Sequence, residues 1–278
     1  MSLLVSNKKK HLDCPICKYK AFFIFNSKNN IAIFKCSNNH CSHFFTPIIK
    51  ENQGICDRPE DIDRESNKDL KIYKERNVRL LNLFIKTLSH NSKPFIFLDY
   101  GSGNANISRT FKSVLGNKCI IYCVEPNPLC EGLYKKYGLE HLQNINAVNK
   151  KIDLVYLTEV IEHLDDPIKS LKELRSILKP NGKIFIATPM GKNNESRTMA
   201  YDTPSHLHFF TEKSLNLTLI KAGFNELEFK HYSEYYPLPK NSAIKKIKYF
   251  IKSFLRKSII SSGLRIGIGH MTGFSKPK

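Results

Sequence analysis

Two features of membrane and exported proteins are missing from this chain of 278 residues. No segment approaches the roughly 20 consecutive apolar residues that a membrane-spanning helix requires, so we expect no integral membrane protein. Residues 1–11 carry three consecutive lysines after a short apolar stretch. They show neither the long apolar segment nor the small-residue cleavage pattern of a secretory signal. We therefore expect a cytoplasmic protein.

Acidic residues are few: 25 Asp and Glu stand against 44 Lys and Arg, for a formal net charge of +19. Such an excess suggests a polyanionic partner such as nucleic acid or an anionic membrane surface. However, the basic residues are mostly lysine, with abundant Asn and Ile beside them. An AT-rich coding bias produces this pattern without any ligand, and we slightly favour that explanation. RNA is therefore kept as an alternative partner and is not the favoured one.

Residues 240–257 form a distinct basic stretch without an acidic side chain. Their apolar residues fall on one helical face and most basic residues on the other, which predicts a basic amphipathic helix. Such a helix either makes peripheral contact with an anionic membrane or covers the sheet of the domain. We favour the packing role, because amphipathic helices usually serve a core.

Four of the eight cysteines lie within the first 41 residues, as two close pairs. Cys14 and Cys17 have C-x₂-C spacing, and Cys36 and Cys41 have the wider C-x₄-C spacing. Two such turns, brought together, supply the tetrahedral thiolate set that a structural Zn²⁺ prefers. The sequence therefore predicts these four cysteines as zinc ligands.

The segment around the cysteines predicts a small zinc-ribbon-like module at residues 1–50. Residues 21–25 and 31–35 are typical of two short strands joined by a polar turn. His40 or His43 is an alternative to the last cysteine as fourth ligand. A set of inert buried thiols is disfavoured, because so short a segment lacks the core to fold unaided.

The rest of the chain predicts one large α/β domain. Residues 51–66 are polar and contain Gly54 and Pro59, as a linker does, and residues 67–278 form the domain. Apolar and helical patterns then alternate, which favours a doubly wound, mainly parallel sheet. The expected helices are 67–90, 104–115, 127–138, 166–178 and 211–222; the expected strands are 95–100, 119–124, 140–146, 152–157, 183–188, one from about 226, and one near 270–276.

A glycine loop follows the first strand of this domain. Gly101 and Gly103 permit a sharp turn and close approach of a ligand. A nicotinamide-type fingerprint would have its third glycine at position 106, where this chain has Asn106, so a dinucleotide is disfavoured. Glu125 ends the second strand, where its carboxylate can accept hydrogen bonds from both hydroxyls of a ribose. Ligands of such sheets bind at the carboxyl ends of the strands.

With these motifs the sequence resembles the class I S-adenosylmethionine-dependent methyltransferases over roughly residues 68–278. The segment EVIEHLDDP at 159–167 is similar to the strand-four region of the group that includes the ubiquinone-biosynthesis O-methyltransferases. ELRSILKPNG at 173–182 resembles the segment before strand five. SHLHFFT at 205–211 resembles methyltransferases of glycans and small molecules, several of which carry an N-terminal zinc-ribbon-like module.

The resemblance implies a Rossmann-like methyltransferase fold and S-adenosyl-L-methionine as cofactor. Two departures stand out: Ala105 replaces a third glycine of the family, and the acidic residue that often follows strand three has no counterpart at 144–149. The implied cofactor-binding residues are Asp99, Gly101, Ser102, Gly103, Asn104, Glu125, Pro126, Thr158 and Glu159.

His163 is the candidate catalytic residue, because a neutral imidazole can accept a hydroxyl proton near pH 7. Its structural alternative is to pair with a carboxylate and shape the loop. A third hypothesis is a divalent-metal site of Glu159, Glu162 and His163 with His206 or His208, resembling that of the small-RNA 2′-O-methyltransferases. Such a metal would activate a ribose hydroxyl.

We therefore predict S-adenosylmethionine-dependent O-methylation of a sugar, glycan or small metabolite. A metal-assisted RNA 2′-O-methyltransferase is the first alternative, and a non-enzymatic binding scaffold is the second.

Overall fold

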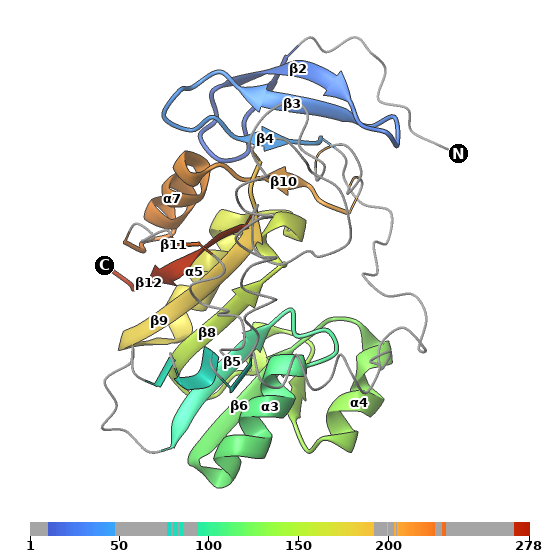
Figure 1. Ribbon diagram of the computed structural model, residues 1–278. Helices are drawn as coiled ribbons and strands as arrows, with labels where there is room; N and C mark the ends of the chain where they lie inside the picture. The colour runs from blue at the N-terminus through green and yellow to red at the C-terminus, as the bar shows by residue number, and fades with distance from the viewer. Residues whose placement is uncertain are drawn as a thin grey trace, which may run out of the picture.

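Two β-sheets organise the computed structural model of the protein (Figure 1). The structure describes residues 11–47, 77–78, 80–82, 84–85, 94–191, 199, 203, 205–225, 230–231 and 270–278. No helix among these residues is long and apolar enough to cross a membrane. The predicted linker at 51–66 and the predicted basic helix at 240–257 lie outside them, as does most of the predicted helix at 67–90.

The larger sheet has seven strands in the order β11-β12-β9-β8-β5-β6-β7. The five strands from β9 to β7 are parallel, and β12 runs antiparallel to both β9 and β11. The predicted, mainly parallel sheet is confirmed. The strands are β5 (Phe95–Tyr100), β6 (Cys119–Val124), β7 (Glu140–Leu142), β8 (Ile152–Thr158), β9 (Leu178–Pro189), β11 (Lys230–His231) and β12 (His270–Ser275).

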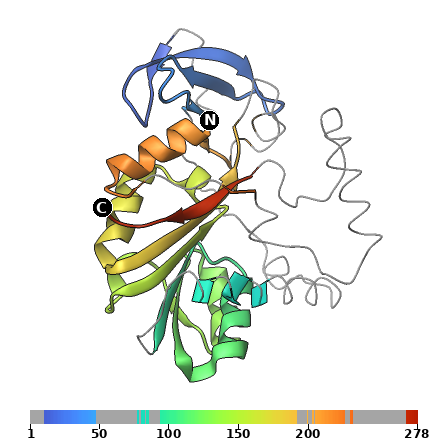
Figure 2. The same ribbon diagram turned by 60° about the vertical axis from the view of Figure 1, so that its left-hand side comes forward.

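Helices cover both faces of this sheet (Figure 2). Side chains of α5 and α7 join one apolar cluster with one face of the strands, and side chains of α3 and α4 join a second cluster on the other face. Strands buried on both faces read as continuous apolar runs, which is how β5 and β8 were predicted. The helices are α3 (Asn106–Leu115), α4 (Glu131–Lys136), α5 (Pro167–Ile177) and α7 (Glu212–Lys221), with 3₁₀ turns η1 (Gly116–Lys118), η2 (Pro128–Cys130), η3 (Ile145–Ala147) and η4 (Ile161–His163).

Part of the predicted helix at 67–90 is described. Residues 77–78, 80–82 and 84–85 are helical. Leu80, Leu81 and Phe84 are buried in the same cluster as α3.

Three boundaries differ from the sequence prediction. The helix expected at 127–138 is only α4, because Pro128 begins a separate 3₁₀ turn and Gly138, at φ 61°, ends the helix. The strand expected at 140–146 stops after β7, where Asn144 accepts a hydrogen bond from the backbone N–H of Asn146 and opens η3. The strand expected at 183–188 is longer, since β9 also includes the residues before Gly182.

The smaller sheet has five strands in the order β1-β2-β3-β4-β10, all antiparallel (Figure 1). Both strands expected between the cysteine pairs are present. The fifth strand comes from the SHLHFFT segment, more than 160 positions further along the chain. The strands are β1 (His11–Asp13), β2 (Lys20–Asn26), β3 (Ala32–Cys36), β4 (Phe44–Phe45) and β10 (His208–Phe209).

Candidate active site and cysteine cluster

The glycine loop turns sharply at the carboxyl end of β5. Gly101 and Gly103 have φ angles of 71° and 47°, in the left-handed region that favours glycine. A Cβ at Gly101 would lie 2.4 Å from Cγ2 of Val160, whereas a Cβ at Gly103 would have nothing within 4 Å. Gly101 is therefore required by the packing of the loop against the end of β8, and the space over Gly103 is open to a ligand.

Ala105 stands at the third position of the loop, where the family often has glycine. It is fully buried and has φ 54° and ψ 30°, directly before α3. An L-residue in this conformation costs roughly 1–2 kcal/mol. Alanine at position 105 therefore keeps the left-handed backbone conformation typical of glycine, and the backbone is strained there.

Glu125 holds the loop from the end of β6. Its Oε2 accepts the backbone N–H of Gly103 at 3.0 Å, and its Oε1 accepts that of Asn127 at 3.0 Å. The side chain is 6% exposed. Each carboxylate oxygen has a second lone pair, so the residue can organise the loop and still accept hydroxyl hydrogens of a ribose.

Asp99 lies beneath the loop in β5. Its Oδ2 accepts the hydroxyl of Ser108 at 2.7 Å. Burial raises the pKa of Asp99 from 3.8 to about 7; the Ser108 hydrogen bond lowers it and the charge of Glu125 adds to the rise. A cationic ammonium group of a ligand beside it would restore the charged carboxylate.

Tyr134, on α4, is a residue of this region that the sequence did not reveal. Its hydroxyl donates to the carbonyl of Gly103 at 2.7 Å and lies 2.9 Å from the hydroxyl of Ser102. His141 stacks on its ring and places Nε2 2.8 Å from the carbonyl of Glu125. The sequence placed Tyr134 only within an expected helix over 127–138. A hydrogen bond between residues 31 positions apart leaves no signal in the local sequence pattern.

The other predicted cofactor residues lie along the same edge. Asn104 bonds within the loop to the N–H of Asn106, and Pro126 is exposed. The hydroxyl oxygen of Thr158, at the end of β8, is buried without a hydrogen-bond partner among the described residues. Glu159 follows with φ 57°, and its N–H donates to the carbonyl of Ala187. An orphaned buried hydroxyl and a strained residue are both frequent features of binding sites.

His163 lies in η4, directly after this edge. Its Nδ1 is 2.7 Å from the carbonyl oxygen of Ser205. A carbonyl only accepts, so Nδ1 carries the proton and, in the neutral ring, Nε2 carries the lone pair. Val160, which contacts Gly101, is three residues earlier. His163 therefore follows, within three residues, the side chain that packs against the glycine loop.

Glu162, His163 and His206 form one cluster, with their candidate ligand atoms within 4.8 Å of one another. Thr188 donates to Oε2 of Glu162 at 2.9 Å, and the rings of His163 and His206 are 4.6 Å apart, edge to face. The cluster has the donor types that Mn²⁺, Zn²⁺ or Fe²⁺ accepts. Of the five residues in the sequence hypothesis, Glu159 and His208 lie outside it.

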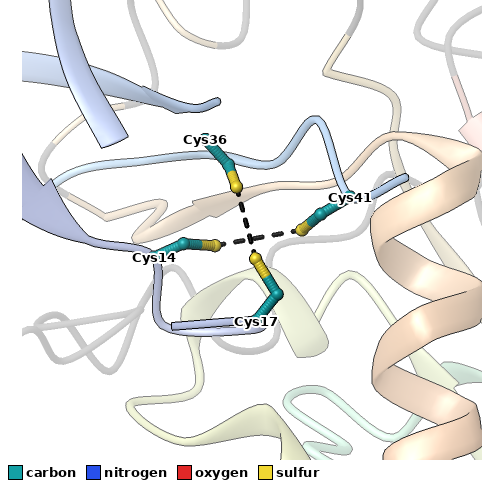
Figure 3. Close-up of side chains that lie close together, drawn as sticks. All are labelled: Cys14, Cys17, Cys36 and Cys41. Atoms are coloured by element: carbon teal, nitrogen blue, oxygen red, sulfur yellow. Dashed lines mark hydrogen bonds between the residues drawn. The ribbon is translucent and has the colours of Figure 1, made fainter. Parts of the chain in front are cut away.

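The four predicted zinc ligands meet at one point, where their sulfur atoms face one another (Figure 3). The Sγ distances are 3.9 Å for Cys14–Cys41 and 3.3 Å for Cys17–Cys36, and all four Sγ atoms lie within 4.8 Å. Zn–S bonds of about 2.3 Å in a tetrahedron require sulfur separations of about 3.8 Å. The geometry therefore fits a tetrahedral metal site.

The electrostatics of the cluster also suit a cation. A hydrogen bond from the thiol of Cys41 lowers the pKa of Cys14 to about 5, and the same bond raises the pKa of Cys41. Burial raises the pKa of Cys36 to about 12. Four thiolates can coexist here only when a cation compensates their charge.

Neither histidine proposed as a substitute ligand belongs to the cluster. His40 is exposed. His43 is buried and bonds to residues far along the chain, with Nε2 3.0 Å from Nδ1 of His208 and Nδ1 3.2 Å from the hydroxyl of Ser214. The remaining described cysteines, Cys119, Cys123 and Cys130, are buried apart from it.

A mainly parallel sheet with a glycine loop after its first strand and an acid at the end of the second is the architecture of a Rossmann-like nucleotide-binding domain, a class that includes the S-adenosylmethionine-dependent methyltransferases. The model of the family described as "Methyltransferase domain" matches residues 72–228, more than half of the chain. The protein belongs to this family. The scaffold alternative is thereby not supported.

Curated relatives match shorter regions. The tRNA U34 carboxymethyltransferase of Nautilia profundicola is 32% identical over 107 residues, which are 36% of this chain and 35% of that protein. The glycine/sarcosine/dimethylglycine N-methyltransferase of Actinopolyspora halophila is 23% identical over 156 residues, 51% of this chain and 27% of that protein. The chain thus spans about a third or less of the length of these relatives.

Among solved structures, a chain of the complex between the Trm112 methyltransferase activator and a methyltransferase of Haloferax volcanii is similar, with a TM-score of 0.53. The sequences are 13% identical, and the match covers 76% of this chain and 94% of that chain. At this identity the likeness supports the fold alone.

Proposed function

We propose that the protein methylates a hydroxyl group of a sugar, glycan or small metabolite, with His163 as general base. The observation that carries this proposal is the bond from Nδ1 of His163 to the carbonyl of Ser205, which makes Nε2 the basic nitrogen. The resemblance of the SHLHFFT segment to glycan and small-molecule methyltransferases supports the acceptor class.

The residues around the glycine loop fit S-adenosylmethionine. Open space over Gly103, the lone pairs of Glu125 and the orphaned hydroxyl of Thr158 are the features that favour it. In this assignment the loop 101–104 and Asp99 hold the methionine part, and Glu125 and Pro126 hold the ribose. Thr158 and Glu159 line the end of β8.

The bound cofactor supplies an already activated methyl group, so the protein contributes mainly by aligning donor and acceptor. His163 accepts the acceptor's hydroxyl proton on Nε2, and the Ser205 carbonyl stabilises the resulting imidazolium through Nδ1–H. General-base catalysis of this kind contributes about 10²–10⁴-fold.

A labelled-methyl assay tests this function. S-adenosylmethionine with a labelled methyl group is incubated with a panel of sugars, nucleotide sugars and hydroxylated metabolites, and the products are analysed by mass spectrometry. We expect His163→Ala to lower kcat by about 10²–10⁴-fold and leave cofactor affinity unchanged. Unchanged kcat in that variant on an accepted substrate contradicts the role of His163.

We also propose that the four cysteines bind a structural Zn²⁺ and that residues 1–50 form a zinc-ribbon-like module. The sulfur separations and the mutual pKa effects among the thiols support this assignment. Metal analysis of the purified protein should give one zinc ion per chain.

RNA is a second candidate acceptor, favoured by the Glu162–His163–His206 cluster and by the tRNA-directed name of one relative. This alternative requires salt-sensitive RNA binding and turnover that depends on a divalent ion. Activity that survives chelation, together with no RNA binding at moderate salt, eliminates it.

A further inference from the structure

We propose that the cysteine module positions the acceptor side of the active site, and that His43 and His208 are the positioning residues that transmit this effect. The proposal rests on the proposed function, in which the acceptor reacts beside His163. It concerns how the turn that carries His163 is held in place.

A backbone connection links the module to that turn. Phe45 of β4 pairs with His208 of β10, and the N–H of Thr46 donates to the carbonyl of Leu207 at 3.0 Å. The N–H of the same Leu207 donates to the carbonyl of Glu162 at 2.9 Å. One residue thus bonds to the module through its carbonyl and to η4 through its amide.

A chain of side-chain hydrogen bonds makes a second connection between the same segments. The positions of its hydrogens can be assigned in order, starting from His208. Nε2 of His208 lies 2.9 Å from the carbonyl of Leu164, so Nε2 is the donor. In a neutral ring Nδ1 then accepts, so Nε2 of His43 donates to it at 3.0 Å. Nδ1 of His43 then carries the lone pair and lies 3.2 Å from the hydroxyl of Ser214.

Burial keeps both rings neutral, as this arrangement requires. The two nitrogens that face each other, Nε2 of His43 and Nδ1 of His208, share one hydrogen, and burial disfavours a charged form of either ring. The rings are 4% and 0% exposed, and their centroids are 5.3 Å apart. Every polar ring atom of the pair therefore has a defined partner, and the two imidazoles join the domains in one fixed geometry.

The cysteine cluster fixes the other end of this connection. The N–H of Cys36 donates to the carbonyl of His43 at 2.8 Å, and the hydroxyl of Thr211 donates to the carbonyl of Cys41 at 3.1 Å. Lys213, on α7, donates to the carbonyl of Asn39 at 2.8 Å. A tetrahedral metal that holds the cysteines therefore also holds His43 against His208.

Residues 205–209 connect the imidazole pair to His163, beside which the methyl acceptor is proposed to react. The carbonyl of Ser205 orients His163, and the ring of His206 packs edge to face against it. In contrast, the carboxylates of Glu125 and Asp99 accept hydrogen bonds from the glycine loop, from Asn127 and from α3. Loosening the imidazole pair should therefore disturb the turn of His163 and leave the cofactor edge intact.

Hydrogen–deuterium exchange on the full chain tests this, with S-adenosylhomocysteine as the binding probe. In His208→Phe, amides in peptides covering 160–165 and 205–210 should exchange at least tenfold faster, while S-adenosylhomocysteine affinity changes less than threefold. His208→Gln, which keeps a donor and an acceptor, should restore part of the protection. Zinc removal with a mercurial and a chelator should accelerate the same peptides.

His141→Phe is the matched control, because it also removes an imidazole that stacks on an aromatic ring and bonds a carbonyl. It should weaken S-adenosylhomocysteine binding and leave the 160–165 and 205–210 peptides protected. Long-range ¹⁵N spectra give a second measurement: the Nδ1-protonated form of His163 should dominate in the wild type and give way to a mixture in His208→Phe.

Unchanged exchange of both peptides in His208→Phe and in His43→Gln overturns the proposal. Equal acceleration of peptides from β5 and β6 also overturns it, because that result indicates general destabilisation. None of these measurements requires methyl transfer, so they separate a failure of this proposal from a failure of the proposed activity.

Discussion

The glycine loop and the cysteine module are both candidate binding regions, but they are stabilised over different distances along the chain. The bond between Gly103 and Glu125 spans 22 positions, and that between His43 and His208 spans 165. The first region is organised by residues at the ends of neighbouring strands. The second depends on two distant segments meeting. We expect substitutions in the glycine loop to affect cofactor binding. Substitutions in the cysteine module should affect folding and the acceptor side of the active site.

The largest effect should come from the cysteine cluster. Replacing Cys14 and Cys17 by serine removes two metal ligands and leaves two buried thiols of the set without a cation, so we expect a loss of about 4 kcal/mol or more of unfolding free energy. Chemical denaturation and zinc analysis measure it. Cys130→Ala, at a buried cysteine outside the cluster, should keep the zinc; loss of zinc there contradicts the assignment.

The next effect is on the cofactor. Gly101→Arg places a side chain where even a Cβ meets Val160 at 2.4 Å, on a backbone with φ 71°, so we expect at least a hundredfold weaker binding of S-adenosylmethionine by calorimetry. Gly132→Ala, where an added Cβ has nothing within 4 Å, is the control and should bind normally. Undiminished binding by Gly101→Arg would remove the glycine loop from the cofactor site.

A pH dependence should follow from Asp99. Its folded pKa, about 7, lies above the unfolded value, so its contribution to stability is complete below about pH 4 and is lost as the pH rises to about 7. Asp99→Asn keeps an acceptor for Ser108 and avoids this loss. We compare the melting temperatures of the variant and the wild type, both without cofactor. The difference between them should change in favour of the variant by on the order of 5 °C from pH 5 to pH 8. A difference that does not vary with pH would contradict the role of burial.

The smallest effect concerns the strained third position of the loop. Ala105→Gly relieves a left-handed φ of 54°, so we expect a gain of about 0.5–1 kcal/mol in unfolding free energy, reduced by the greater freedom of glycine in the unfolded chain. Denaturant titration measures it. A destabilised variant would show that the lost methyl packing outweighs the strain.

The fold around the glycine loop could be predicted well from the sequence because its signals are local. Apolar runs bounded by turns placed β5 and β6 at their observed limits, and Gly101 and Glu125 follow those strands directly. The cysteine spacing likewise predicted that four thiol side chains meet at one point. Each of these features follows from short-range geometry of the chain.

What the sequence could not predict are the contacts between distant segments. His43 was considered as a metal ligand, because spacing alone cannot show that its ring turns toward His208. The SHLHFFT segment likewise gives no sign that the rings of His206 and His208 have different partners, or that the segment completes the smaller sheet. Such pairings depend on the packing of the whole molecule.

The completion of the small sheet by β10 has a consequence for synthesis of the chain. β1 to β4 leave the ribosome long before residues 208–209, so β4 has an unpaired edge until most of the methyltransferase domain has been made. Pairing over such a sequence distance is slow, because a long loop must close first. The four cysteines, all within the first 41 residues, can therefore come together before the smaller sheet is complete. The joining of β4 to β10 is expected as a late step that commits the whole chain to its native structure.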